Sequence, residues 1–206
     1  WALDGFGALS HHMARLVVRA LKISEDEIDW QSVGPPPERI ERLLNDSIDV
    51  SLIRVEEATS LNSDQNNNLH TLMGFSELKD LVPIQPHGVL ATTEAYEQAH
   101  PEELHRLTRG MIRASRALND DFENFRKVYD HNVTVPVADE DIYDIWKKER
   151  DSSGFAIDGE LSEEHWQKQM GLFYELNPDL PKISRNDVIA ENFVADALEQ
   201  LGALSG

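Results

Sequence analysis

The sequence contains no cysteine, which excludes disulfide bonds, a thiolate nucleophile and cysteine-ligated zinc or iron–sulfur sites. Basic residues are also scarce, because 19 Lys and Arg stand against 38 Asp and Glu and leave a formal net charge of −19. A chain this acidic is a poor partner for nucleic acid or for an anionic membrane surface. Long apolar runs are lacking as well, since no stretch approaches the roughly 18 residues that a membrane-spanning helix requires. We therefore expect neither nucleic-acid binding nor membrane insertion.

Apolar residues are nevertheless plentiful enough for folding. The chain has 206 residues, of which 40% are hydrophobic. This composition is not that of a disordered chain, and it can supply one sizeable core or two small ones.

The first 98 residues alternate between two kinds of pattern. Apolar and β-branched runs predict strands, at 1–4, 28–33, 48–53, 69–73 and 89–93. Spacings of three and four residues predict helices between the first three strands, at 11–22 and 38–45. In the second of these helices, Ile40, Leu43 and Leu44 are expected to be buried. The order of elements predicts an α/β lobe with a mainly parallel sheet over residues 1–98.

Residues 99–206 carry helical periodicity instead. Helices are expected to begin near His100, Asp120, Asp139, Ser162 and Asn186. We expect this region to be a helical C-terminal part that packs on the lobe and on its hinge.

The segment from Asp4 to His11 is the first candidate binding element, since it places a glycine turn between a strand and a helix. Such a turn directs free backbone N–H groups and the positive end of the helix dipole toward one point, which suits an anion. Gly5 and Gly7 also have the spacing of a dinucleotide-binding fingerprint, although Ser10 stands where that fingerprint has its third glycine or alanine. An ordinary tight turn, with Ser10 as the helix N-cap, fits the same residues.

Arg54 is the second candidate, because it directly follows the strand predicted at 48–53. In a parallel α/β lobe, the loops after the strands form the ligand crevice. A guanidinium there can form a two-pronged pair with a carboxylate, sulfonate or phosphate. The alternative is that Arg54 pairs with Glu56, Glu57 or another carboxylate of this acidic chain.

Patterns typical of metal sites and of serine hydrolases are missing. The eight histidines are scattered, without the His-Glu-x-x-His pattern of zinc enzymes, and the chain has no Gly-x-Ser-x-Gly elbow. We therefore expect no metal, no cofactor and no catalytic residue.

The order of several segments resembles the substrate-binding proteins of ABC importers for nitrate, sulfonates, taurine and thiamine precursors. The segments that carry the resemblance are Gly5–Leu21, Ile28–Trp30, Arg39–Ile53, Val89–Tyr96 and His100–Leu104. The likeness covers about residues 1 to 120 well and the later helices loosely.

The resemblance implies a type II periplasmic binding protein fold, in which two α/β lobes close on a ligand. The segment that begins at Trp1 would then follow a first lobe, which we expect to be missing from this sequence. The implied function is capture of a small anionic or polar solute, such as a sulfonate, a carboxylate or a pyrimidine-type compound. The implied partner is an ABC permease, and the implied location is the periplasm or another extracytoplasmic space.

The resemblance also assigns a binding site, in which the backbone from Gly7 to Ser10 and the Ser10 hydroxyl hold the anionic group. The loop after Ile53 faces the same ligand in this family, although family members often have an aromatic or small residue followed by Glu/Asp-Pro where this chain has Arg54-Val-Glu56-Glu57. The expected ligand-binding residues are Phe6, Gly7, Ala8, Leu9, Ser10, His11, Arg54 and Glu56.

Two other functions stay open at this point. One is a decarboxylase-like enzyme on the same scaffold, with His11 or His87 moving a proton. The other is a ligand-sensing domain whose C-terminal helices form a dimer surface.

Overall fold

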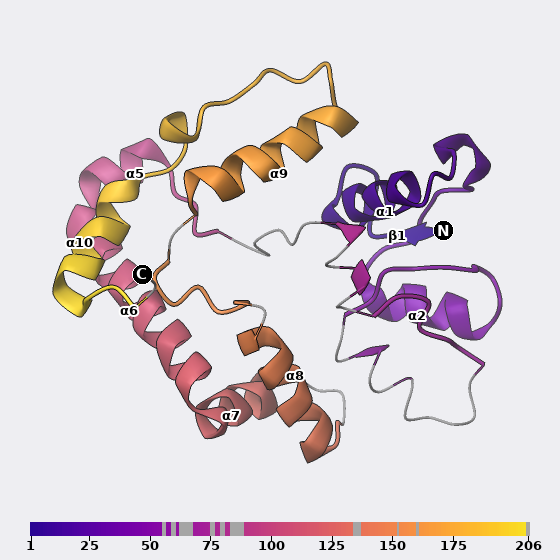
Figure 1. Ribbon diagram of the computed structural model, residues 1–206, viewed down its shortest axis with the longest axis horizontal. Helices are drawn as coiled ribbons and strands as arrows, with labels where there is room; N and C mark the ends of the chain where they lie inside the picture. Colours follow the sequence, from indigo (N-terminus) through magenta and orange to yellow (C-terminus); the bar gives the residue numbers. More distant parts are fainter. Residues whose placement is uncertain are drawn as a thin grey trace. The chain divides into compact units, whose positions relative to one another are not determined.

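The computed structural model describes the chain except for residues 55, 56, 59, 60, 62–67, 75, 76, 79, 80, 83–88, 134–136, 152, 160, 205 and 206. The described residues are mostly helical (Figure 1). Two compact units divide the chain. Unit 1 comprises Trp1–Ile84, Val135–Val137 and Gly171–Asp179, and unit 2 comprises Gln85–Thr134, Ala138–Met170 and Leu180–Gly206. The predicted division into domains 1–98 and 99–206 stays a prediction.

Unit 1 contains a very small parallel sheet. Strand β1 (Ala2–Leu3) pairs with β2 (Gln31–Ser32), with Ala2 opposite Gln31 and Leu3 opposite Ser32. On its other edge, β1 forms a single parallel bridge from Ala2 to Ser51. Because it lies between two neighbours, β1 is fully buried.

The predicted α/β lobe is therefore wrong, because strands make up only 3% of the structure and helices dominate the described residues. A parallel strand is stable only when both of its faces are covered. The runs at 69–73 and 89–93 fail this condition and are not strands: Leu72 is 76% exposed, and Val89 and Leu90 are 67% and 62% exposed.

A helix follows each of the two strands, β1 and β2. Helix α1 (Leu9–Ala20) buries Ala14, Leu16, Val17 and Val18 along one face. After a short 3-10 helix, η1 (Glu25–Glu27), and β2, helix α2 (Pro36–Leu44) begins with prolines, which fit the first turn because its N–H groups have no intrahelical acceptor. Within α2 the buried residue is Arg39, whereas Leu44 is 50% exposed. The expected apolar stripe on this helix is thus incorrect at Leu44.

The core of unit 1 forms where α1 meets the last turns of α9 (Glu163–Leu176), whose residues from Gly171 onward belong to this unit. Its buried members are Leu16, Val17, Val82 and Leu176, and the partly buried side chains around them are Trp1, Met13, Met73, Leu78, Leu81 and Leu172.

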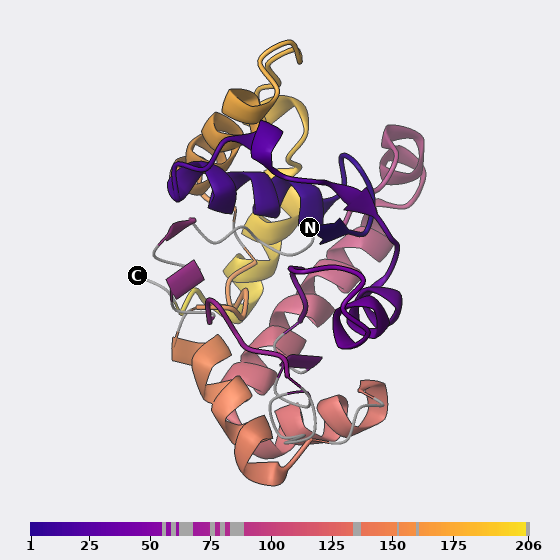
Figure 2. The same ribbon diagram turned by 90° about the vertical axis from the view of Figure 1, so that its right-hand side faces the viewer.

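Unit 2 is built from helices, most of which lie in the segments expected from periodicity, although periodicity predicts no helix at 94–99. They are α5 (Glu94–Ala99), α6 (Pro101–Asp120), α7 (Phe122–Asn132), α8 (Asp139–Asp151), the first part of α9, the 3-10 helix η2 (Arg185–Asp187) and α10 (Glu191–Leu201). Helix α10 packs along α6, as both views show (Figures 1 and 2), and this contact buries Ile112, Phe193 and Ala197. None of the described helices has the length and apolarity needed to cross a membrane.

Candidate functional site

The candidate site is the turn that joins β1 to α1. The Ala8 N–H donates to the Gly5 carbonyl at 3.2 Å, which closes the turn. Gly7 has φ +79°, a left-handed conformation that favours glycine over residues with a Cβ. This local requirement explains why the segment carries glycine at position 7.

Ser10 supports the turn from inside. Its side chain is buried, and its hydroxyl accepts a hydrogen bond from the Asp4 N–H at 2.9 Å. The residue at the N-cap position is Ala8, which makes no side-chain capping bond, so the expectation that Ser10 caps the helix is wrong. The Ser10 hydroxyl binds the Asp4 N–H of the incoming chain, and the helix begins one residue before Ser10, at Leu9.

The amides of Leu9 and Ser10 are the free donors of this helix end. The N–H groups of His11 and His12 both donate to the Ala8 carbonyl at 3.1 Å. Within the described parts of the chain, no acceptor contacts the Leu9 or Ser10 N–H. Two unpaired N–H groups therefore remain at the positive end of the α1 dipole.

His11 packs beside these amides as a neutral ring. Its Nδ1 accepts from the Gly7 N–H at 3.0 Å, which leaves the ring proton on Nε2. Burial lowers the pKa of His11 below its usual 6.5, and the nearby Arg15 lowers it further. The ring is in edge contact with Phe6 and Trp30, at centroid distances of 5.4 and 5.6 Å. At neutral pH, His11 thus offers an N–H donor and not a positive charge.

His12 belongs to the packing beneath the turn. Its ring lies 5.3 Å from that of Phe173 in α9. Burial lowers the pKa of His12, and Arg15 again contributes. Arg15 is itself paired with Glu25, at 2.7 Å.

An apolar surface flanks the free amides. Phe6 is 65% exposed and Leu9 is 49% exposed. Six of the expected ligand-binding residues are consecutive in the sequence and form the turn and the first residues of α1: Phe6, Gly7, Ala8, Leu9, Ser10 and His11.

The other two expected residues come from the segment after the strand predicted at 48–53, which forms only a bridge at Ser51. Arg54 is exposed, and its backbone N–H donates to the Glu57 carboxylate at 2.9 Å. Glu56 lies outside the described residues. The roles of Arg54 and Glu56 in ligand binding stay predictions.

Arg39 is the polar residue that sequence reasoning missed. Its guanidinium is 3% exposed and forms an ion pair with Asp4 at 2.7 Å. It also donates to the Gly34 carbonyl at 3.0 Å, to the Ser51 hydroxyl at 3.0 Å and to the Leu52 carbonyl. Asp4 follows β1, Gly34 follows β2, and Ser51 and Leu52 lie in the segment that bridges to β1 at Ser51. One side chain therefore connects these three segments. The spacing of Pro36, Arg39 and Leu43 could have indicated that Arg39 is buried, because it places Arg39 between two apolar residues on one face of α2.

The described ranges contain no group of three or more His, Asp or Glu side chains that could hold a metal ion. The arrangement at the turn is one of hydrogen-bond donors, a neutral imidazole and exposed apolar surface. Its chemistry is therefore that of recognition of an acceptor-bearing molecule.

Comparison with known proteins adds no family to this description. No protein-family model matches the chain, and no match was found among curated proteins or among solved structures. The resemblance to importer binding proteins and the function that it implies stay predictions.

Proposed function

We propose that this chain binds a small anionic organic solute at the turn before α1. The observation that carries the proposal is the pair of unpaired amides, Leu9 N–H and Ser10 N–H, at the positive end of a twelve-residue helix. Oxygen atoms of a carboxylate or sulfonate accept hydrogen bonds from such amides, and the helix dipole favours the negative charge.

The surroundings of the amides suit the organic part of the solute. The exposed side chains of Phe6 and Leu9 offer apolar contact, and the His11 Nε2–H offers a further donor. With the order of segments noted above, these features support a role in solute capture for an ABC importer. A closing α/β clamp is not part of the proposal, because the strands of unit 1 are only two residues long.

The test is an NMR titration of backbone amides with benzenesulfonate and benzoate, with benzyl alcohol as the uncharged control. Two amides and a helix dipole predict weak binding, with a Kd of about 1 mM or weaker. We expect the Leu9 and Ser10 amide signals to shift with the two anions and not with benzyl alcohol.

Leu9→Pro is the matched variant, because it removes a single N–H from the first helical position. Proline is tolerated there, and Ala8 already has the extended conformation (φ −72°, ψ 168°) that a residue before proline adopts. Loss of one hydrogen bond, about 1 kcal/mol, should weaken benzenesulfonate binding about fivefold. Leu9→Ala keeps the N–H and serves as control. Equal binding by Leu9→Pro and Leu9→Ala would remove this amide from the site.

A further inference from the structure

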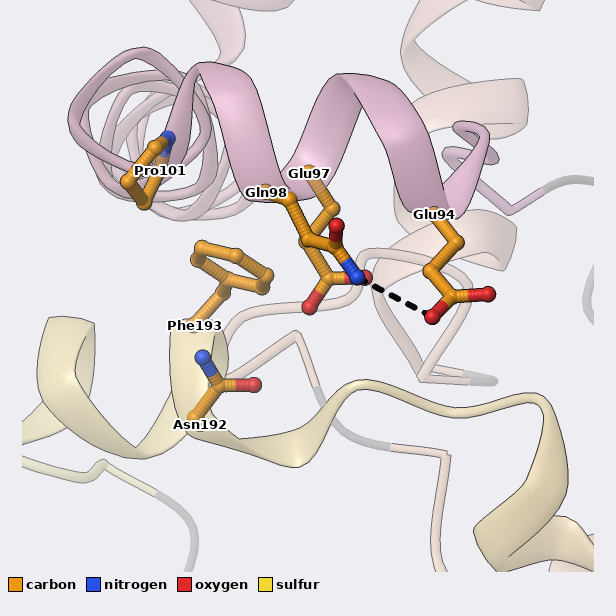
Figure 3. Close-up of a pocket in the computed structure, with 6 residues that line it drawn as sticks. All are labelled: Glu94, Glu97, Gln98, Pro101, Asn192 and Phe193. Atoms are coloured by element: carbon orange, nitrogen blue, oxygen red, sulfur yellow. Dashed lines mark hydrogen bonds between the residues drawn. The ribbon is translucent and has the colours of Figure 1, made fainter.

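Helix α6 is covered by α10 on one side and exposed on another. Figure 3 shows the Phe193 side chain of α10 directed toward Pro101, the first residue of α6. The Phe193 ring also packs against His105 at a centroid distance of 4.7 Å. Further along the helix, the Arg109 guanidinium donates to the Gln200 side-chain oxygen at 2.8 Å. The side of α6 that faces α10 is therefore already occupied.

The exposed side of α6 carries apolar residues at helical spacing. Leu107 is 47% exposed, and Met111, one turn later, is 46% exposed. Gly110 and Ala114 are also exposed. Spacings of three and four residues place these four residues in one stripe along the helix, which we call the α6 stripe. An amphipathic helix docks on a surface of this kind through its own apolar face.

Gly110 has no neighbour in the described fold that requires a glycine. It lies in the interior of α6, where glycine is less favourable than alanine. A Cβ added at this position would meet no atom within 4 Å in the part of the chain that the structure describes. A glycine on an exposed helix face permits close approach of another backbone. The missing side chain therefore leaves room for a partner.

Arginines without carboxylate partners line one edge of the α6 stripe. Other arginines of this acidic chain pair with carboxylates, as Arg126 does. Arg106 and Arg113 are exposed, and among the described residues no carboxylate lies within ion-pair distance of either. They are about two turns apart on the same edge, and the acceptor of the neighbouring Arg109 is the uncharged Gln200. We call this positively charged border the arginine edge.

We propose that the exposed side of α6 docks an acidic amphipathic helix of a partner protein. Apolar side chains of the partner cover Leu107 and Met111, and its carboxylates pair with Arg106 and Arg113. The net charge of −19 opposes this pairing little at physiological ionic strength, because exposed charges more than about 8 Å apart are largely screened. The α6 stripe lies in unit 2, so the proposal does not depend on the function proposed for the turn before α1.

A second copy of this chain fits the surface less well than an acidic helix. A two-fold contact through the α6 stripe makes the two helices antiparallel and aligns the arginine edge of one copy with that of the other. Like charges then face each other without carboxylates between them, which is unfavourable. Charge complementarity therefore favours a partner whose helix carries carboxylates beside its apolar stripe.

The test is fluorescence anisotropy with a labelled helical peptide of about five turns, which has leucines along one stripe and glutamates on both sides of it. A second peptide has lysine in place of each glutamate. We expect the full chain to bind the glutamate peptide saturably and the lysine peptide not at all. The affinity should fall as salt is raised, because exposed ion pairs are screened. Absence of saturable binding, or equal binding of both peptides, would overturn the proposal.

Charge reversal at Arg113 tests the arginine edge. Arg113→Glu should weaken binding of the glutamate peptide about tenfold, because it replaces an attractive pair by a repulsive one. Arg42→Glu is the matched control, since Arg42 is an exposed arginine of α2 that also has no carboxylate partner in the described ranges. It should bind as the unmodified chain does. Equal weakening in both variants would mean general attraction between opposite charges and would overturn the proposal.

Gly110→Gln tests the close approach of the partner. Glutamine is a better helix former than glycine, so the melting temperature should rise by about 2 °C. The glutamate peptide should nevertheless bind about tenfold more weakly, because the new side chain fills the α6 stripe. Gly171→Gln is the matched control, since Gly171 is an exposed glycine in α9 at which a Cβ also meets no described atom within 4 Å. It should melt higher and bind unchanged.

Two results would contradict the proposed partner. A Gly110→Gln variant that melts higher and binds the glutamate peptide unchanged would exclude a helix on the α6 stripe. Self-association of the unmodified chain in sedimentation, if Gly110→Gln abolishes it, would assign the surface to a second copy instead.

Discussion

In each unit of this protein, an arginine lies where distant segments of the chain meet. Arg39 of unit 1 and Arg116 of unit 2 differ in the solvent exposure of their carboxylate partners. In unit 1, Arg39 joins Asp4 to the carbonyl groups of Gly34 and Leu52. In unit 2, Arg116 of α6 donates to the carbonyls of Ile157 and Gly202 at 2.8 and 2.6 Å and pairs with a carboxylate, that of Asp158, at 2.7 Å. Both guanidiniums thus satisfy backbone carbonyls that secondary structure leaves without donors.

The carboxylate partners make the difference. The side chain of Asp4 is 42% exposed, whereas that of Asp158 is 5% exposed. Asp158 also accepts from the Leu204 N–H at 3.0 and 3.2 Å, and so holds the segment that follows α10. Removing a carboxylate that water can replace costs little, whereas removing a buried one takes an acceptor from a charged group and from an N–H group where water cannot replace it.

The largest expected loss of stability is therefore at the buried pair Arg116–Asp158. Asp158→Ala should lower the free energy of unfolding by about 3 kcal/mol, because the Arg116 guanidinium and the Leu204 N–H would both lose an acceptor at a site that water does not reach. Urea unfolding followed by circular dichroism measures this loss. Asp151, whose exposed carboxylate pairs with Arg150 at 3.4 Å, provides the control. Asp151→Ala should cost under about 0.5 kcal/mol. Equal losses in the two variants would show that burial does not set the value of these pairs.

A smaller loss of stability is expected at the pair Arg39–Asp4 of unit 1, whose carboxylate is exposed to water. Asp4→Ala should cost about 1 kcal/mol, because water can take the place of the carboxylate and Arg39 keeps its other acceptors. The same urea experiment measures it. A loss as large as that of Asp158→Ala would contradict the comparison and would place the Asp4 carboxylate in a drier setting than its exposure indicates.

Periodicity predicted the helices well because it reports a local property. In α6, α8 and α10, apolar side chains recur at intervals that place them on one face, and this suffices to specify a helix wherever any apolar surface is available. The predicted strands depended on something that is not local. A run such as 48–53 becomes a strand only if a neighbour pairs with it along its length, and here pairing is limited to a single bridge at Ser51.

The candidate sites show the same limit. The glycine turn before α1 could be found from the sequence, because Gly5, Gly7 and the helix start are adjacent in the chain. Arg39 was missed because charged residues are expected to face water, and only the fold brings the carbonyls of Gly34 and Leu52 to its guanidinium. The arginine edge of α6 could not be predicted either, since only the fold shows which arginines of this acidic chain lie within reach of a carboxylate.

The smallest expected effect concerns pH and lies in unit 1, at the histidines of the α1 turn. Burial lowers the pKa values of His11 and His12, and the nearby Arg15 lowers them further. Acid should therefore weaken the packing around this turn.

The direction follows from proton linkage. With a native pKa below the unfolded value near 6.5, each of His11 and His12 binds fewer protons in the native state than in the unfolded state. Their contribution to stability is therefore complete above that value and is lost as the pH falls from it toward the lowered native pKa.

His11→Asn removes one titrating group and keeps an acceptor for the Gly7 N–H. At pH 8, its stability relative to the unmodified chain reports the change in packing alone. Between pH 6.5 and 5, the unmodified chain should lose more stability than His11→Asn, as urea unfolding measures, and protection of the Gly7 amide from hydrogen exchange should fall over the same range. Parallel stability curves over that range would mean that His11 titrates alike in the folded and unfolded chain, and that burial at the turn is too slight to lower its pKa.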